Sequence, residues 1–307
     1  MKTFIKVIEI WIPDKARTQL EFGSGLYGPL TDFKKASKQQ TFAYDEGLPG
    51  KAWAQGKPIV LTRFEHSYFK RINEAQQAGL TCGIAIPIFS GEFLLAVVVF
   101  LCGDDAEHAG AIEVWCNEPA TDNALSVMDG YYGSLKHFEQ VSRQLSMPKG
   151  YGLPGMVWQT RMPILIEDIS KAPDSSRAME AQQTGITTGL GIPVVHNNGQ
   201  IYIMTFLSAK ATPIAKRIQI WHPNNSHTHL ICQQGYSKNN NDLAELFENT
   251  TIKKGSGALG RVWLTGMPLI TCHQETEYNP ELDDLTSMLA IPVIEQGKLQ
   301  SIVTFLF

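Results

Sequence analysis

The chain repeats one pattern of residues three times, and this repeat limits its fold more than any local motif does. Around three regularly spaced tryptophans the sequence reads GLPGKAWAQGKPIV, GLPGMVWQTRMPIL and GALGRVWLTGMPLI. Gly50, Gly155 and Gly260 of these segments lie 105 residues apart. All six tryptophans form pairs separated by 42, 43 and 42 residues: Trp11 with Trp53, Trp115 with Trp158, and Trp221 with Trp263. We therefore predict three copies of one module.

Further landmarks recur in every copy and predict where each module begins and ends. The first tryptophan of each pair closes IEIW, IEVW or IQIW, and a later segment reads AIPI, GIPV or AIPV before a final apolar stretch. These landmarks predict module 1 at residues 1–103, module 2 at 104–209 and module 3 at 210–307. Between Pro268 and Pro292 the third copy spans 24 residues, against 29 and 30 in the other copies, so module 3 has a shortened segment.

The hydrophobic pattern of the first copy predicts a mixture of strands and short helices. Strands are expected at residues 5–12, 20–22 and 58–62, helices at 30–38 and 67–78, and a single helical turn from Pro49 to Gly56. In the second copy we expect Ser134 to cap the helix that follows it. Two apolar strands joined by a tight hairpin, clearest at Asn198 and Gly199, end each module. The predicted class is α+β, with three repeated antiparallel sheets flanked by short helices.

Composition excludes several classes of function. Lys and Arg total 26 against 30 Asp and Glu, without a basic block, which argues against binding to nucleic acid. The longest apolar run, FLLAVVVFLC, is about half of the roughly 20 residues that a membrane helix needs, so we expect no membrane association. Five cysteines without a C-x-x-C pair favour a reduced, cytoplasmic setting.

The order of these landmarks resembles that of the GAF domain. The resemblance rests on a strand ending in Trp, the G-x-P-G-x-x-W segment, a helix ending in Gly, x-I-P-V, a hairpin and an apolar strand ending in Phe. It implies a GAF/PAS-like fold with a small-molecule or chromophore pocket between the sheet and its covering helices, used to regulate an attached enzyme or transcription factor. It also implies long signalling helices between modules.

The connections between modules are too short for such helices. Only 14 residues separate Phe100 from Trp115, and likewise Phe206 from Trp221, which leaves room for about one helical turn. We therefore expect pared-down GAF modules without an output domain on the same chain. A partner protein would then carry the output activity.

One motif suggests a binding feature. The pattern R-x-x-x-A-Q-Q-x-G occurs at residues 71–79 and 177–185, and on a helix Arg71, Ala75 and Gly79 share a face. An Arg at a pocket mouth with neighbouring Gln amides would suit a carboxylate or phosphate. The alternative is that the Arg and Gln are merely solvated. With the paired tryptophans as pocket walls, the candidate ligand-binding residues are Arg71, Gln76, Gln77, Trp53, Arg177, Gln182, Gln183 and Trp158.

Metal and thiol chemistry are not expected. His222, His227, His229 and Cys232 invite a zinc interpretation, but strand alternation places Cys232 on the face opposite His227 and His229. Some GAF-like proteins resemble enzymes that reduce free methionine sulfoxide with a set of cysteines. Cys82 is aligned with Thr188 and Ser287 and lacks a visible resolving partner, so it reads as a small buried residue.

The sequence thus favours a non-catalytic, cytoplasmic regulatory protein that binds a small molecule and signals to a partner in trans. A protein-interaction scaffold without a ligand is the main alternative, and a thiol redox enzyme of the free methionine sulfoxide reductase type is a distant one. No catalytic residue, metal ligand or cofactor is identified from the sequence.

Overall fold

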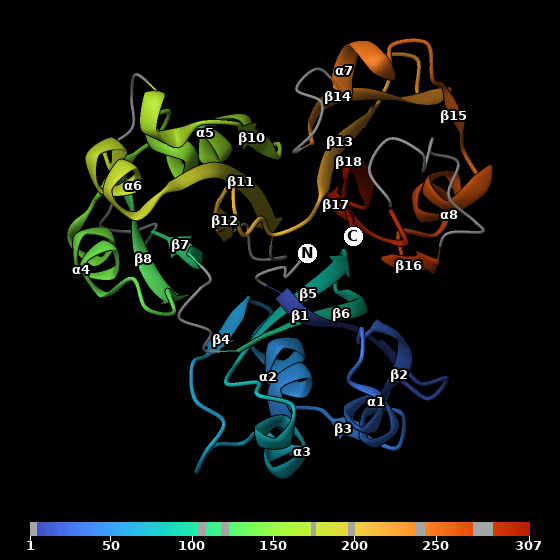
Figure 1. Cartoon of the computed structure of the whole chain (residues 1–307). Helices are drawn as coiled ribbons and strands as arrows, with labels where there is room; N and C mark the ends of the chain where they lie inside the picture. The colour runs from blue at the N-terminus through green and yellow to red at the C-terminus, as the bar shows by residue number, and fades with distance from the viewer. Residues whose placement is uncertain are drawn as a thin grey trace. The chain divides into compact units, whose positions relative to one another are not determined.

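The computed structural model describes residues 5–103, 109–117, 123–172, 176–195, 200–237, 243–272 and 285–307. It contains three six-stranded sheets in succession along the chain, coloured blue to teal, green to yellow and orange to red in Figure 1. Each sheet is built from six consecutive strands, and the strand pairings within the sheets are antiparallel. The predicted α+β class and the three repeated sheets are confirmed.

The three sheets have one strand order. The first is β3-β2-β1-β6-β5-β4, from β1 (Ile5–Pro13), β2 (Gln19–Leu26), β3 (Thr41–Ala43), β4 (Ile59–Leu61), β5 (Cys82–Ser90) and β6 (Phe93–Cys102). The second is β10-β11-β12-β7-β8-β9, from β7 (Gly110–Cys116), β8 (Ala124–Tyr131), β9 (Met147–Pro148), β10 (Ile164–Ile166), β11 (Ile186–Val195) and β12 (Ile201–Ala209). The third is β15-β14-β13-β18-β17-β16, from β13 (Arg217–Pro223), β14 (His229–Ser237), β15 (Ile252–Lys253), β16 (Leu269–Cys272), β17 (Ser287–Glu295) and β18 (Lys298–Leu306).

Short helices connect the strands within each module. They are α1 (Thr31–Lys38), α2 (Gly47–Gln55) and α3 (Ile72–Gln77) in module 1, α4 (Lys136–Gln144), α5 (Gly152–Thr160), η1 (Ile169–Lys171) and α6 (Ala178–Thr184) in module 2, and α7 (Leu243–Leu246) and α8 (Gly257–Thr265) in module 3. The second helix of each module packs on the sheet, as do α6 and α7. Strand β1 and helix α1 match the prediction closely.

Three local predictions need correction, and one cannot be judged. The predicted single turn at Pro49 is a nine-residue helix, α2. The predicted helix 67–78 is shortened to α3, because the Ser67 hydroxyl accepts the amide of Phe69 and holds a turn there. Helix α4 has Leu135, not Ser134, at its N-cap, without a side-chain cap bond. The hairpin predicted at residues 198–199 lies outside the described residues.

A β-bulge precedes the first tryptophan of every module. In each case one extra residue of the second strand is skipped, so that Trp11 pairs with Phe22, Trp115 with Val127, and Trp221 with Cys232. The three indole side chains are fully buried. Because a bulge bends its strand and increases the local twist, it re-aims the neighbouring side chain. The matching bulges therefore place three equivalent tryptophans in the module cores.

The repeated glycine of the G-x-x-G-x-x-W segment is required by backbone packing. A Cβ atom on Gly50, Gly155 or Gly260 would lie 2.2, 2.2 or 2.4 Å from the carbonyl oxygen of the last residue of the preceding short edge strand, β3, β9 or β15. The glycine carbonyls also accept amide hydrogen bonds of 3.1, 2.8 and 2.7 Å from the turn before the helix. Only glycine permits this close approach. The second tryptophan then falls at the seventh position of each nine-residue helix, α2, α5 and α8.

By packing of its backbone, the chain forms two compact units, one of Met1–Pro87 and Ala96–Ile214, the other of Ile88–Leu95 and Ala215–Phe307. Within the first unit the rings of Phe100 on β6 and Phe206 on β12 meet edge-on, with centroids 5.5 Å apart. Residues 210–216 form turns and no helix, as their short spacing predicts. No described helix is long and apolar enough to cross a membrane. The module boundaries themselves stay a prediction.

Replacing Gly50 by alanine should destabilise the protein by about 3 kcal/mol, since the new Cβ would collide with the Ala43 carbonyl oxygen at 2.2 Å and force a backbone shift. Chemical denaturation gives the measurement. Gln55→Ala, at an exposed position of the same helix, is the control and should change the free energy of unfolding by less than about 0.5 kcal/mol. Equal effects of the two substitutions would refute this role of the glycine.

Candidate functional site

A buried ion pair lies between the sheet and the helices of module 1. Glu9 on β1 receives two hydrogen bonds from the Arg71 guanidinium, of 2.5 and 2.9 Å, and both side chains are almost fully buried. The same carboxylate accepts from the Trp11 indole and the Tyr27 hydroxyl, each at 3.0 Å. Arg71 also donates to the Ser37 hydroxyl of α1. One guanidinium therefore connects the central strand, α1 and the segment that leads into α3.

Module 2 builds the same cluster from equivalent residues. Arg177, at the N-cap of α6, forms an ion pair with Glu113 on β7, and a 2.7 Å hydrogen bond joins it to the Ser142 hydroxyl of α4. Glu113 accepts from the Trp115 indole at 2.9 Å and from the Thr205 hydroxyl at 2.7 Å. The repeat of this geometry shows that the ion pair is a property of the module.

Aromatic rings enclose both guanidinium groups. Arg71 lies 4.7 Å from the ring centroid of Phe33 and 5.5 Å from that of Trp11. Arg177 lies 4.8 Å from that of Phe138. A cation over an aromatic face is stabilised by the negative face of the ring, and this attraction is larger when water is excluded.

The electrostatics of the pair favour the charged carboxylate. Burial alone would raise the pKa of Glu9, but the Arg71 charge and the hydrogen bonds from Arg71 and other donors outweigh burial and hold the pKa below its ordinary value. Burial likewise opposes ionisation of Glu113, and the Arg177 charge and its hydrogen bonds again lower the pKa overall. Both glutamates are therefore ionised at neutral pH.

Module 3 replaces this cluster. Gln219 stands where the other modules have glutamate, and its side-chain oxygen accepts from the Thr304 hydroxyl at 3.4 Å. A different arginine, Arg217 on β13, is fully buried and lies 5.9 Å from the ring centroid of Phe247. Residues 273–284, where the counterpart of the Arg71 segment would lie, are outside the described residues. The neutral amide is consistent with the loss of the R-x-x-x-A-Q-Q-x-G motif from this module.

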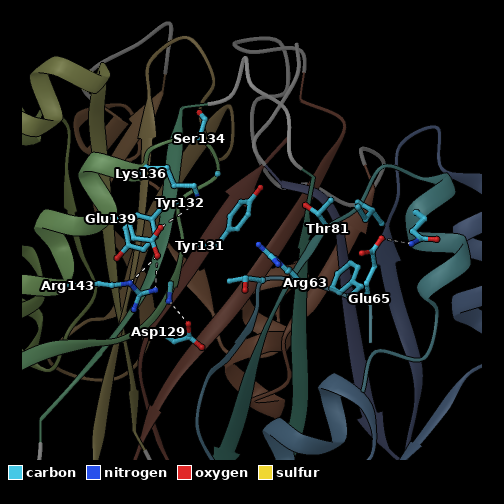
Figure 2. Close-up of a pocket in the computed structure, with 16 residues that line it drawn as sticks. Arg63, Glu65, Thr81, Asp129, Tyr131, Tyr132, Ser134, Lys136, Glu139 and Arg143 are labelled. Carbon is cyan, nitrogen blue, oxygen red and sulfur yellow. Dashed lines mark hydrogen bonds and ion pairs between the residues drawn. The ribbon is translucent and has the colours of Figure 1, made fainter. Parts of the chain in front are cut away.

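A cavity of about 730 Å³ lies within the first unit (Figure 2). Its walls come from residues 62–81 of module 1 and 129–143 of module 2. Strands β4 and β8 pack against each other beside it. Figure 2 shows Arg63 and Thr81 on one wall and Asp129, Glu139 and Arg143 on the other. A cavity of this size suits a small organic molecule.

Several charged groups of the cavity wall already have partners on their own module. Arg143 donates to Glu139 through two nitrogens, at 3.0 and 2.9 Å. Glu65 accepts from the Gln76 amide at 3.0 Å. The wall therefore mixes paired charges with aromatic and small side chains.

The structure separates the arginines of the motif from its glutamines. Arg71 and Arg177 are buried inside their modules, as are Ala75 and Ala181 on the same helix face, whereas the two glutamines of each copy are exposed: Gln76, Gln77, Gln182 and Gln183. The alternative interpretation, in which the arginines are solvated, is wrong, because a carboxylate in the core pairs with each of them. Only Gln76 of these residues lines the cavity of the first unit. Direct ligand binding by the set stays a prediction.

The second tryptophans lie at the edge of the core. Trp53 and Trp158 are partly exposed and Trp263 is 8% exposed. Equivalent residues lie against them: the Tyr44 ring is 5.2 Å from that of Trp53, and lysine ammonium groups lie 5.8 Å from the centroid of Trp158 and 5.9 Å from that of Trp263. Each tryptophan thus packs under a side chain of its own module. A role for Trp53 and Trp158 as pocket walls stays a prediction.

Thiol and histidine groups show no assembled reactive site in the part of the chain that is described. Cys82 is fully buried at the start of β5, and burial raises the pKa of Cys232 to about 12. His227 lies in the turn before β14, with φ of 51°. The prediction that His227 and His229 share one face of a strand is therefore wrong. Among the described residues no three His, Cys, Asp or Glu side chains are arranged to hold a metal ion.

Sequence comparison assigns residues 114–214 to the GAF domain model, which covers most of module 2. A search of curated protein sequences finds no relative of the chain. The sequence signals that pointed to the fold, the glycine and tryptophan spacing, therefore agree with a family match over one of the three copies.

Solved structures match about one third of the chain. The GAF domain of A. aeolicus nlh2 is 24% identical over 34% of this chain and 61% of that one, with a TM-score of 0.26. Free methionine-R-sulfoxide reductase from Neisseria meningitidis is 16% identical over 32% and 52%, with a TM-score of 0.26. NreA from Staphylococcus aureus, mutated in its nitrate binding site, is 15% identical over 35% and 79%, with a TM-score of 0.29. The chain spans less than two thirds of the first two structures.

Removing the arginine should destabilise the first module strongly. Arg71→Met leaves the Glu9 carboxylate buried without its cation and should lower the free energy of unfolding by about 3 to 5 kcal/mol. Combining it with Glu9→Gln should recover most of that loss, because no buried charge is left unpaired. The exposed pair Lys35–Asp32 is the control, and Lys35→Met should cost less than about 1 kcal/mol. A double variant no more stable than Arg71→Met would contradict the ion-pair account.

The same pairs predict acid sensitivity. The pKa values of Glu9 and Glu113 are lowered by folding, so their stabilising contribution is fully present above the ordinary pKa of 4.5 and is lost as the pH falls through the folded-state values. Between pH 7 and pH 3 the wild type should lose more stability than the Glu9→Gln/Arg71→Met variant. Thermal unfolding across this range tests it, and parallel pH profiles of the two proteins would exclude the effect.

Proposed function

We propose that this chain is a non-catalytic regulatory protein of three GAF-like modules, which binds a small molecule and passes its state to a partner protein in trans. The match of residues 114–214 to the GAF domain model supports this proposal. GAF domains are in general regulatory domains that bind small molecules. The proposal adds a location for the ligand, the cavity between residues 62–81 and 129–143.

The cavity is the observation that carries this proposal. Its volume of about 730 Å³ falls in the range of small-molecule sites, and it is lined by aromatic, charged and hydroxyl side chains of two modules. By contrast, the space between sheet and helices in module 2 holds the Glu113–Arg177 pair and a continuous apolar cluster. A ligand in this cavity would contact both walls, so its binding would depend on the positions of the two lining segments and would also change them.

In this proposal Arg71 and Arg177 act on the cavity through its walls. Arg71 fixes the start of the segment that supplies Gln76, Leu80 and Thr81 to one wall. On the other wall, Tyr132 packs against Phe138 with ring centroids 6.4 Å apart, and Phe138 lies under the Arg177 guanidinium. The two ion pairs would hold the binding surfaces in place without contacting the ligand.

A protein-interaction scaffold is the second candidate. The filled module cores favour it, since the apolar clusters of modules 2 and 3 contain the first tryptophan of each module among closely packed aliphatic side chains. A scaffold would bind partner protein with the cavity empty or filled by water. We place the thiol redox enzyme third, because the described cysteines are buried or partly buried rather than exposed and activated.

Native mass spectrometry of the purified protein tests the proposal. We expect a fraction of the protein to exceed the sequence mass by that of one small molecule. Ser134→Trp, which places an indole in the cavity wall, should reduce this fraction at least tenfold. Ser126→Trp, at an exposed position of β8 away from the cavity, is the matched control and should leave it unchanged.

A protein that carries no small molecule, and whose melting temperature does not respond to a broad panel of metabolites, would favour the scaffold. A bound molecule retained equally in the Ser134→Trp and control variants would refute the location while leaving a ligand-binding function in place.

A further inference from the structure

One carboxylate of the cavity wall lacks a cationic partner. Asp129 on β8 is half-buried and accepts the Gly130 amide at 2.8 Å. Lys57 and Arg143 influence it electrostatically, but neither makes an ion pair with it, and within the described chain no other residue does. A half-buried carboxylate retains lone pairs for further donors. This group is therefore suited to a cation supplied from outside the chain.

One cation of the wall is likewise unpaired. Arg63 follows β4 in module 1 and is exposed to the cavity, and it makes no ion pair within the part of the chain that the structure describes. Figure 2 shows its guanidinium directed into the space between the two walls. A guanidinium presents five donors in a fork that matches a carboxylate. Arg63 is thus suited to an anionic group.

The remaining charged, hydroxyl and aromatic groups of the cavity lining narrow the choice of ligand. Arg143 and Lys136 both form ion pairs with Glu139, and Glu65 accepts a hydrogen bond from the neutral Gln76 amide. Arg63 and Asp129 are therefore the charged groups of the lining that have no side-chain partner among the described residues. The Thr81 hydroxyl oxygen is buried at the cavity and has no hydrogen-bond partner among the described residues. Aromatic side chains, among them Phe64 and Tyr132, supply an apolar part of the wall.

We propose that this cavity binds a free amino acid, with Arg63 receiving its carboxylate and Asp129 its ammonium group. The inference rests on the proposed function and names the chemical class of its ligand. An amino acid carries both charges on one small molecule, and its side chain would occupy the remaining volume beside Phe64 and Tyr132. A purely anionic ligand would leave Asp129 unpaired and repelled, whereas a purely cationic ligand would do so for Arg63.

Ligand-observed NMR with three probe mixtures tests the charge requirement directly on the wild-type full chain. The mixtures are the free L-amino acids, their N-acetyl derivatives, which lack the ammonium group, and their amides, which lack the carboxylate. We expect saturation transfer to at least one free amino acid and none to its two derivatives. Equal transfer to either derivative, or no transfer to any free amino acid, would overturn the proposal.

Matched substitutions assign the two contacts. Arg63→Gln and Asp129→Asn should each weaken binding of that amino acid by about tenfold or more, since each removes a charge-assisted hydrogen bond. Lys34→Gln and Asp32→Asn, both on helix α1 and outside the cavity lining, should leave affinity unchanged. Circular dichroism melting curves confirm that all four variants are folded. Full affinity in both cavity variants would refute the assignment.

These outcomes separate the inference from the proposed function. If native mass spectrometry reveals a bound molecule of another class while no free amino acid binds, the amino-acid assignment fails and the regulatory function survives. If no molecule of any class binds, both fail together.

Discussion

The buried carboxylate–guanidinium pair is the interaction on which modules 1 and 2 depend. A single unpaired charge in either core would cost several kcal/mol, so the strand that carries the glutamate and the segment that carries the arginine must come together. The bidentate geometry of Arg71 and Glu9 also fixes their relative orientation, which an apolar contact would leave freer. Ser37, bonded to both Arg71 and the Phe33 carbonyl, adds helix α1 to the same network.

This network positions the cavity walls. The chain runs from Arg71 through α3 directly to Leu80 and Thr81, and in module 2 the ring of Tyr132 lies beside the cluster that holds Arg177. Loop and short-helix segments of this kind would otherwise be among the least stable parts of a fold. Anchoring them by buried ion pairs gives a cavity wall that is built mostly from connections between strands and still has a defined shape.

Much of the fold could be predicted from the sequence because each strand and helix of the module is encoded three times, and the copies can be compared. The glycine spacing identified a position that all three copies share, and the close approach of Gly155 to the Pro148 carbonyl gives the physical reason. The Glu–Arg pair was missed, although the signal was present: Glu9 and Glu113 occur with the arginine motif, and Gln219 occurs without it. Considered only within its own helix, each arginine was assigned to a ligand. A comparison of the three copies would have linked the arginine to the glutamate that is present in the same two copies.

The cavity could not be predicted in this way, since the two unpaired charges of its wall do not repeat between the copies. Arg63 is aligned with Asp168 of module 2, and Asp129 with Ser24 of module 1. The repeat identifies only positions that the copies share. It therefore gives no information about a cavity whose two walls carry different residues from different modules. Such a site depends on how two modules pack within one unit, and that packing leaves no periodic trace in the sequence.

The difference at Gln219 also bears on how the chain avoids errors during synthesis. Three copies of one sheet can exchange equivalent segments while they fold, a characteristic failure of repeated domains. If strand β13 took the place of β1, Gln219 would face Arg71, and the arginine would be buried without its carboxylate. Such a mismatch would make exchange between the third copy and the first two unfavourable, so the charge difference between the copies favours the native pairing of strands.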